Sequence, residues 1–315
     1  MDSPTPLRRL PHHVVHYSEE DPATTTGGVQ TFARSLALLF EEVSFMTPAT
    51  RDEEIVRAGR LPVICDNHFV ADWSADIPVI GFQHGVGAVK FEATRSLSHW
   101  RLQRRQRRAA KRPGTLWVAC AQWIAATFER LYGNGASHVI YHSIDVERFD
   151  GRLRNAGSRL LLHDARLKHK GRDLMPVLAR AFPAWTFEPL ACAPADVPDR
   201  MRGARAFIHL SRYEGNSIVC NEAMAMNLPC LFTQVGLMQD ADRPTEVVLV
   251  DPDRAFSDPD WLVAQTGHFL DMLDSEALTP RDWVLTQATR AQSIARWSAV
   301  MNDFQGMPWE HPRPS

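Results

Sequence analysis

The stretch 206–232 constrains the fold more than any other part of this chain. It opens with an apolar run at 206–210 and closes with another at 229–232, and each run is typical of a buried strand. Between them, Gly215 permits a sharp turn, and apolar residues at helical spacing over 219–226 predict a helix. The order strand, glycine turn, helix, strand predicts a parallel α/β unit.

The predicted helix start has the properties of a phosphate site. Asn216 and Ser217 are residue types that favour helix N-caps. The backbone N–H groups up to Ile218 would be free at the start of the helix, which is the positive end of its dipole. Glu214 lies just before this start and Glu222 lies in the second turn. Ionised glutamate accepts hydrogen bonds from hydroxyls, so the pattern favours a diphosphate with a sugar at one end and a ribose at the other.

This stretch resembles the donor-site motif of retaining GT-B glycosyltransferases, whose hallmark is two glutamates separated by seven residues. Glu214 and Glu222 have that spacing, and they are followed by Ala-Met-Ala at 223–225 and by Pro229. The resemblance implies an α/β GT-B fold, with two Rossmann-like parallel-sheet domains facing each other across a cleft. It also implies that Glu214 meets the donor sugar, that Glu222 meets the ribose, and that the backbone from Gly215 to Ile218 holds the diphosphate.

Length and composition agree with a soluble globular protein of two domains. The chain has 315 residues, 44% of them hydrophobic and 23% charged, and a net charge of −2 that gives no support to polyanion binding by the molecule as a whole. Five cysteines without regular spacing favour a reducing compartment over a disulfide framework. Because neither a signal peptide nor an apolar run of membrane-spanning length is evident, we expect a cytoplasmic location.

In the first half, alternating apolar runs predict a parallel sheet. The expected strands are 13–17, 61–65, 77–82, 116–120 and 138–141, and the expected helices are 29–40 and 122–132. Gly27 and Gly28 precede the first of these helices; such a pair is often only a turn, but the resemblance implies a position near the donor phosphates and the acceptor. It also implies that His84, at the carboxyl end of a predicted strand, contacts the donor sugar, although a packed histidine is the alternative.

Three polar residues follow the second predicted strand. Asp66, His68 and Asp72 match no metal-ligand spacing, and we interpret them as loop residues. Asp251 and Asp253 form an Asp-x-Asp pair, but the resemblance is to glycosyltransferases that need no divalent metal in the site. We therefore expect no metal and no cofactor apart from the nucleotide-sugar substrate.

A second α/β half follows a predicted linker. The linker is 150–158, the strands are 159–163, 185–190, 206–210, 229–232 and 246–251, and the additional helices are 194–202, 261–273 and 281–300. We predict an N-terminal domain over 1–150 and a C-terminal donor domain over 151–289, with a helix at about 290–315 packing back on the first domain, as the resemblance implies.

The segment 164–171 resembles the family's Gly-Arg…Lys-Gly segment, in which an arginine and a lysine neutralise the leaving diphosphate. Lys170 matches the lysine. The arginine is displaced, with Arg166 as the nearest candidate, Lys168 as its rival, and Asp164 where glycine is usual. A solvated basic loop is the alternative interpretation of all three basic residues.

A basic stretch at 101–112 predicts an amphipathic helix. Such a helix suits an anionic membrane surface, which would hold the protein at the inner face of the membrane. Nucleic-acid binding is disfavoured because aromatic residues are not interleaved with the charges, and a solvated helix face is the remaining alternative.

Taken with the resemblance, these features predict a retaining glycosyltransferase. It would move a sugar from a nucleotide diphosphate such as UDP or GDP to a glycan or lipid-linked acceptor, in the synthesis of surface polysaccharide, lipopolysaccharide or glycolipid. His84, Lys170 and Glu214 are its predicted catalytic residues. The displaced arginine sustains an alternative, a catalytically silent GT-B protein that binds a nucleotide sugar or a partner enzyme. An oxidoreductase would require a glycine fingerprint that this sequence lacks.

Overall fold

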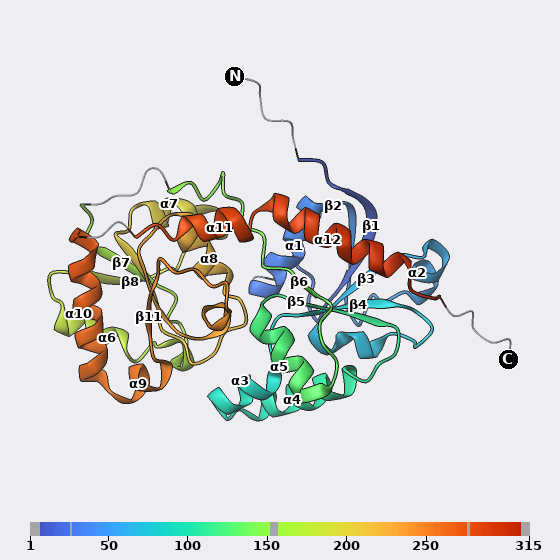
Figure 1. Cartoon of the computed structure of the whole chain (residues 1–315), viewed down its shortest axis with the longest axis horizontal. Helices are drawn as coiled ribbons and strands as arrows, with labels where there is room; N and C mark the ends of the chain where they lie inside the picture. The colour runs from blue at the N-terminus through green and yellow to red at the C-terminus, as the bar shows by residue number, and fades with distance from the viewer. Residues whose placement is uncertain (1–6, 26, 152–156, 276–277, 310–315) are drawn as a thin grey trace, which may run out of the picture. The chain divides into compact units, whose positions relative to one another are not determined.

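The computed structural model describes residues 7–25, 27–151, 157–275 and 278–309. The chain divides into two compact α/β units, shown in Figure 1. The first comprises residues 1–91, 96–143 and 290–315, and the second comprises residues 92–95 and 144–289. The predicted linker at 150–158 falls largely outside the described residues.

The first unit is built on a six-stranded parallel sheet of order β2-β1-β3-β4-β5-β6. Its strands are β1 (Leu10–Tyr17), β2 (Phe40–Met46), β3 (Val63–Asp66), β4 (Val79–Gln83), β5 (Thr115–Ala119) and β6 (His138–Val139). Its helices are α1 (Gly28–Leu39), α2 (Glu53–Gly59), α3 (Gly87–Thr94), α4 (Leu97–Ala109), α5 (Gln122–Tyr132) and α12 (Arg290–Gln305), with a short 3-10 helix, η1 (Asn67–Asp72).

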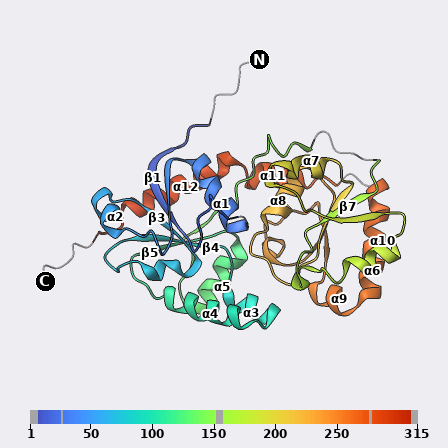
Figure 2. The same ribbon diagram turned by 180° about the vertical axis from the view of Figure 1, so that it is seen from behind.

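Alternate side chains of these strands face two different helical layers, because successive residues of a strand point to opposite faces of the sheet. Val15, Val63 and Val79 pack in one core with residues of α2, α4 and α5. On the opposite face Phe82 stacks between Phe32 of α1 and Trp297 of α12. Figures 1 and 2 show α1 and α12 together beside this sheet.

The second unit holds a five-stranded parallel sheet of order β11-β10-β9-β7-β8. Its strands are β7 (Leu160–His163), β8 (Thr186–Pro189), β9 (Ala206–His209), β10 (Cys230–Thr233) and β11 (Val248–Val250). Its helices are α6 (Met175–Ala181), α7 (Val197–Arg202), α8 (Ile218–Ala225), α9 (Pro252–Ser257), α10 (Pro259–Ser275) and α11 (Arg281–Gln287), with 3-10 turns η3 (Lys168–Lys170), η4 (Pro194–Asp196) and η5 (Gly236–Gln239).

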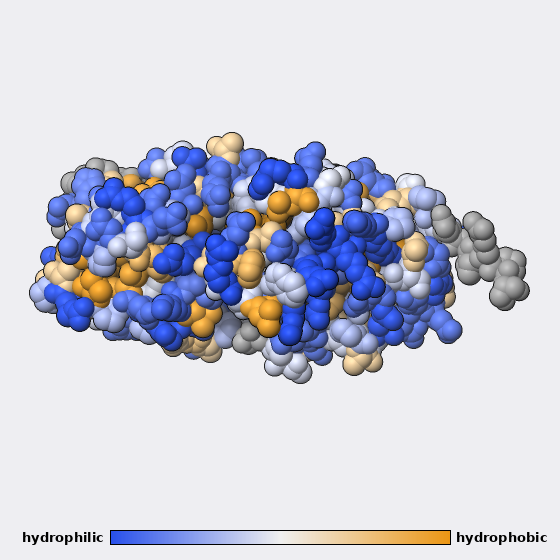
Figure 3. Space-filling model, turned by 90° about the horizontal axis from the view of Figure 1, so that it is seen from below, coloured by the Kyte–Doolittle hydropathy of each residue, from blue (hydrophilic) through white to orange (hydrophobic). Residues whose placement is uncertain are grey.

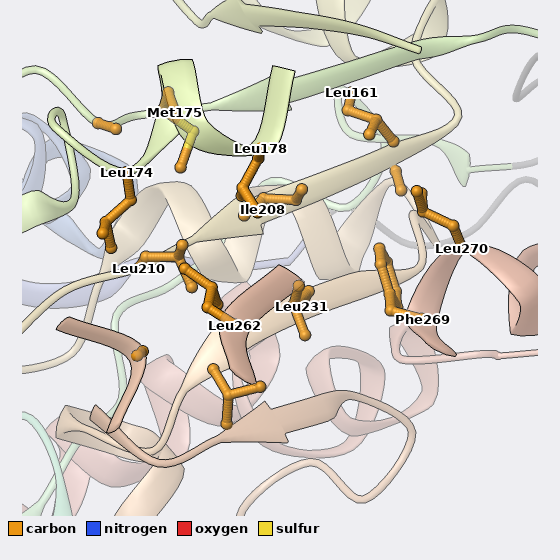
Figure 4. Packing of buried hydrophobic residues seen from close by; sticks show 14 of the residues in the cluster. Leu161, Leu174, Met175, Leu178, Ile208, Leu210, Leu231, Leu262, Phe269 and Leu270 are labelled. Atoms are coloured by element: carbon orange, nitrogen blue, oxygen red, sulfur yellow. The ribbon is translucent and has the colours of Figure 1, made fainter. Parts of the chain in front are cut away.

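One face of this second sheet carries an apolar core. Leu161, Ile208 and Leu231 come from three adjacent strands and pack against α6 and α10, as Figure 4 shows. Leu178 of α6 and Phe269 of α10 are fully buried in this layer. The predicted glycine turn and helix α8 connect the adjacent strands β9 and β10 of this packed sheet.

Two predictions of local structure were wrong. The predicted helix 29–40 ends at Leu39, and the chain passes at once into the edge strand β2. The predicted helix 281–300 is two helices, α11 and α12. They separate because Ile144 pairs with Thr289 and its N–H donates to the carbonyl of Ala288, which takes these residues out of helical geometry.

Candidate active site

The turn after β9 lies where the strand order of the second sheet reverses, between β7 and β9. Ligands of open α/β sheets bind at such reversals, beyond the carboxyl ends of the strands. Ser211 fixes the turn to β10, because its N–H donates to Thr233 Oγ1 (2.9 Å) and the Thr233 hydroxyl donates back to the Ser211 carbonyl (2.7 Å). Arg212 N–H also donates to the His169 carbonyl (2.8 Å), which holds the loop after β7 against the same turn.

Four charged side chains meet at this point. His209 donates through Nδ1 to Asp164 Oδ1 (2.5 Å) and through Nε2 to Glu214 Oε1 (3.1 Å). Lys170 Nζ lies 3.3 Å from Asp164 Oδ2 and 3.0 Å from Glu214 Oε1. We call Asp164, Lys170, His209 and Glu214 the charged ring. The structure thus brings two predicted catalytic residues, Lys170 and Glu214, into direct contact.

The charged ring is electrically balanced, and each member stabilises the ionised form of its neighbours. Burial opposes ionisation of Glu214, but His209 and Lys170 outweigh it and lower its pKa to about 2. For Asp164 the same two cations also outweigh burial and hold the pKa well below its usual range. Burial favours the neutral forms of His209 and Lys170. Asp164, followed by Cys220, nevertheless raises the pKa of His209, and Glu214 and Asp164 raise the pKa of Lys170. The ring therefore holds two positive and two negative charges at neutral pH.

The second glutamate of the motif, Glu222, has its pKa shifted in the opposite direction from that of Glu214. Glu222 lies on α8, and burial raises its pKa to about 7, with only Arg148 acting in the opposite direction. Among the described residues, none is hydrogen-bonded to the Glu222 carboxylate. A half-buried acceptor of this kind is suited to ligand hydroxyls, which would replace the water that burial removes.

A cavity of about 280 Å³ opens beside the charged ring. Its lining residues are Asp164, Arg166, Leu167, Lys170, Leu190 and Val219. Arg166 lies at the wall and donates to the Leu190 carbonyl, whereas Lys168 is not among the lining residues. The volume is near the lower end for small-molecule pockets and suits a diphosphate with part of its nucleoside.

No side chain caps the start of α8, which adjoins the cavity. Ser217 occupies the predicted N-cap position but makes no side-chain cap hydrogen bond. The Asn216 side chain instead accepts a hydrogen bond from Asn221 Nδ2 (2.9 Å). Val219, in the first turn, lines the cavity, so the positive end of the helix dipole adjoins it.

Gly236 presses against the outside of the glycine turn. Its φ is +61°, and a Cβ there would lie 2.8 Å from the Gly215 carbonyl oxygen and 2.9 Å from the Glu214 Cβ. A side chain at this position would displace the turn that carries Glu214.

In the first unit, His84 lies just beyond β4 with its ring fixed by a buried carboxylate. His84 Nε2 donates to Asp66 Oδ1 (2.7 Å), and His16 Nε2 donates to the same oxygen (3.2 Å). Asp66 is 3% exposed at its side chain, and the two histidines outweigh burial to hold its pKa well below its usual range. Because Nε2 of His84 is committed to Asp66, Nδ1 is the ring position left for a ligand.

Aromatic rings surround this histidine. His142 stacks on His84 with ring centroids 5.7 Å apart, and Phe32 meets His84 edge-on at 4.9 Å. Burial, followed by the proximity of His84, lowers the pKa of His142 to about 3, so this ring stays neutral. Asp66, predicted to be a loop residue, is instead the last residue of β3 and buried.

The two predicted glycines lie at the start of α1. Gly27 occupies the N-cap, and a Cβ there would lie 2.5 Å from Gln30 Oε1. A Cβ on Gly28 would meet no atom within 4 Å. Space is therefore present at Gly28, and at Gly27 only the end of the flexible Gln30 side chain would have to move.

Sequence reasoning missed His209 and the pairing of Asp66 with His84. His209 lies inside the apolar run 206–210 and was interpreted only as part of a strand. A histidine in an otherwise apolar buried strand, five residues before a motif glutamate, was the available signal. In the sequence, Asp164 differs from its surroundings only by standing where the family usually has glycine.

The basic stretch forms α4 and extends beyond its end. Gln106 and Ala109 are buried on its inner side, where the Gln106 side chain donates to the Gly85 carbonyl (2.8 Å). The exposed side carries arginines together with Trp100, 39% exposed, over which Arg104 lies at 4.9 Å. Figure 3 shows hydrophilic residues interspersed with apolar ones on the face seen from below.

A search of the described residues found neither a helix long and apolar enough to cross a membrane nor a group of three or more His, Cys, Asp or Glu side chains placed to hold a metal ion.

Comparison with solved structures identifies the class of fold. Sucrose-phosphate synthase from Thermosynechococcus elongatus superimposes with a TM-score of 0.71 at 15% identity, covering 93% of this chain and 99% of that one. HepE from Anabaena, solved with UDP and glucose, gives 0.69 at 14% identity over 92% and 99% of the two chains. Trehalose 6-phosphate synthase from Burkholderia multivorans gives 0.60 at 12% identity over 94% and 97%. The fold is GT-B, as predicted.

The sequence itself gives a family match within the second unit. Residues 156–269 match the family described as Glycosyl transferases group 1, and this segment contains the charged ring, Glu222 and the cavity. No curated protein matches the sequence. The match and the fold together support a GT-B glycosyltransferase.

Proposed function

We propose that this protein is a retaining, metal-independent glycosyltransferase that takes its sugar from a nucleoside diphosphate. The observation that carries this proposal is the cavity beside the start of α8, where Lys170, Arg166 and the helix dipole supply positive charge and where Lys170 contacts the acceptor Glu214. Such a site stabilises a departing diphosphate, which is the main electrostatic requirement of glycosyl transfer.

Each residue has a role in this proposal. Lys170 and Arg166 neutralise the diphosphate, and the backbone from Gly215 to Ile218 holds it. Glu214 orients the sugar hydroxyls through Oε2, because Oε1 is already shared by His209 and Lys170. Glu222 accepts the ribose hydroxyls.

His84 is proposed to contact the donor sugar through Nδ1, with Gly27 and Gly28 close to the phosphates and the acceptor. Retention needs no enzymic nucleophile in this scheme, since the leaving phosphate takes the acceptor's proton. UDP is the first nucleotide to test, because HepE was solved with UDP and with UDP-glucose.

We propose a glycan or a lipid-linked acceptor, and a cytoplasmic protein held at the inner membrane face by α4. Its exposed arginines and Trp100 suit an anionic lipid surface. Vesicles of phosphatidylglycerol should retain the wild type, and vesicles of phosphatidylcholine should not. The variant Arg104→Glu/Arg108→Glu should lose retention, whereas Arg180→Glu, an exposed arginine of the second unit, should not; equal retention of all three proteins would contradict this role.

Turnover distinguishes the enzyme from a silent GT-B protein. The wild type should release nucleoside diphosphate from one nucleotide sugar, and Glu214→Gln should release it at least about tenfold more slowly. A bound acceptor would then reveal retention through the anomeric configuration of the product. Tight binding of a nucleotide sugar without any release, with a range of acceptor extracts supplied, would favour the silent alternative.

A further inference from the structure

The proposed leaving-group lysine is already neutralised before any ligand arrives. Lys170 lies within 3.3 Å of Asp164 and 3.0 Å of Glu214, so its single charge is shared by two carboxylates. A diphosphate could recruit Lys170 only by competing with both. The site must therefore contain something that lowers the cost of releasing this lysine.

His209 has the contacts to do this. It is buried, with a side chain 3% exposed, and it donates one N–H to each of the carboxylates that hold Lys170. If Lys170 turned towards a phosphate, Asp164 and Glu214 would each keep a charge-assisted hydrogen bond from His209. Without His209, the same movement would leave two largely buried carboxylates without either of the two cations that contact them here.

We propose that His209 is a positioning residue of the donor site: its positive charge balances Asp164 and Glu214, so that Lys170 is free to transfer to the diphosphate of the ligand. This inference rests on the proposed function. His209 touches neither sugar nor phosphate in this scheme, and it acts through Lys170 and Glu214. Asp164 has the opposing effect, because it is the carboxylate that restrains Lys170.

Substitutions of His209 and of Asp164 should therefore change the affinity for a diphosphate in opposite directions. In His209→Asn the ring keeps two carboxylates and one lysine, so Lys170 is held more tightly and diphosphate affinity should fall by about tenfold or more. In Asp164→Asn the ring keeps two cations and one carboxylate, so affinity should rise by about threefold. In the double variant the charges balance again, and affinity should return to within about threefold of wild type.

The test is calorimetric titration of the full-length protein with UDP, GDP, ADP and dTDP. The diphosphate that binds the wild type is then titrated into the three variants, together with its monophosphate, for which the changes should be smaller. His163→Asn is the matched control: His163 is also buried at a strand end, but its Nδ1 accepts from the Ala165 N–H instead of meeting a carboxylate. Its affinity for the diphosphate should stay close to that of wild type.

The outcomes separate this inference from the proposed function. If none of the four diphosphates binds the wild type, the proposed donor site is refuted. If one binds, but Asp164→Asn weakens it or the double variant is as weak as His209→Asn, then His209 has only a packing role and the inference is overturned. Should His209→Asn fail to fold, as judged by thermal unfolding, the increase expected for Asp164→Asn still decides the question.

Discussion

Replacing Glu222 with glutamine should make the protein more stable at alkaline pH while weakening its proposed ligand site. Burial raises the pKa of Glu222 from 4.5 to about 7, with Arg148 giving only partial relief. The folded state therefore holds a proton between these two values that the unfolded state releases. It follows that stability falls as pH rises through this window, and the full cost is present above pH 7.

The magnitude follows from the size of the shift. A pKa raised from 4.5 to about 7 corresponds to at most about 3 kcal/mol of destabilisation when the carboxylate is ionised. Glu222→Gln removes that cost because glutamine has no charge to bury. For a unit of this size the gain amounts to a rise in Tm of about 6–12 °C at pH 8.5, and to little change at pH 4.5.

Thermal unfolding of wild type and Glu222→Gln at these two pH values provides the assay. Glu246→Gln is the matched control, because Glu246 is exposed and has no burial cost to lose. If Glu222→Gln is no more stable than wild type at pH 8.5, or if its advantage is equally large at pH 4.5, then burial of an ionised Glu222 is not the cost that the structure indicates.

Three further predictions concern the first unit, the core and a loop glycine. Asp66→Asn removes the carboxylate that fixes the ring of His84, so turnover should fall by about tenfold to a hundredfold with nucleotide affinity nearly unchanged; an equal loss of affinity and turnover in kinetic assays would argue against positioning. Leu231→Ala empties a fully buried position in the second core and should cost about 2–5 kcal/mol in denaturant unfolding, whereas a loss under about 1 kcal/mol would contradict the packing. Gly171→Ala adds a Cβ 2.7 Å from the Leu210 carbonyl at a φ of +77°, so it should destabilise by more than about 1 kcal/mol and weaken diphosphate binding through Lys170; unchanged stability and affinity would show that the loop relaxes freely.

The parts of the fold that sequence predicts well are those in which local pattern and burial agree. Strands β9 and β10 are continuous apolar runs because both of their faces are covered, and they were predicted within a residue or so. The edge strand β2 was missed because Glu41 and Glu42 interrupt its apolar residues and because its sequence runs directly on from α1. Helix α9 was missed because Asp251 was considered as a strand end and as part of an Asp-x-Asp pair, whereas it caps the helix by accepting from the Arg254 N–H.

The residues of the candidate site also fall into those that local sequence predicts and those that it does not. Glu214 and Glu222 were predicted from their spacing within one stretch, 206–232, and Lys170 from its place in the segment 164–171. The Asp164–His209 contact joins residues 45 positions apart, and it depends on strand register. The pairing of His163 with Ile208 brings the next residues of the two strands, Asp164 and His209, side by side, which no local pattern reveals.

Binding of a nucleoside diphosphate to the second unit tests the central claim most directly. Calorimetric titration of wild type and Glu222→Ala with UDP, GDP, ADP and dTDP should show one diphosphate that binds the wild type and loses about tenfold or more in affinity in the variant. If none of the four binds, or if the affinity is the same in Glu222→Ala, the donor site does not lie between the charged ring and α8.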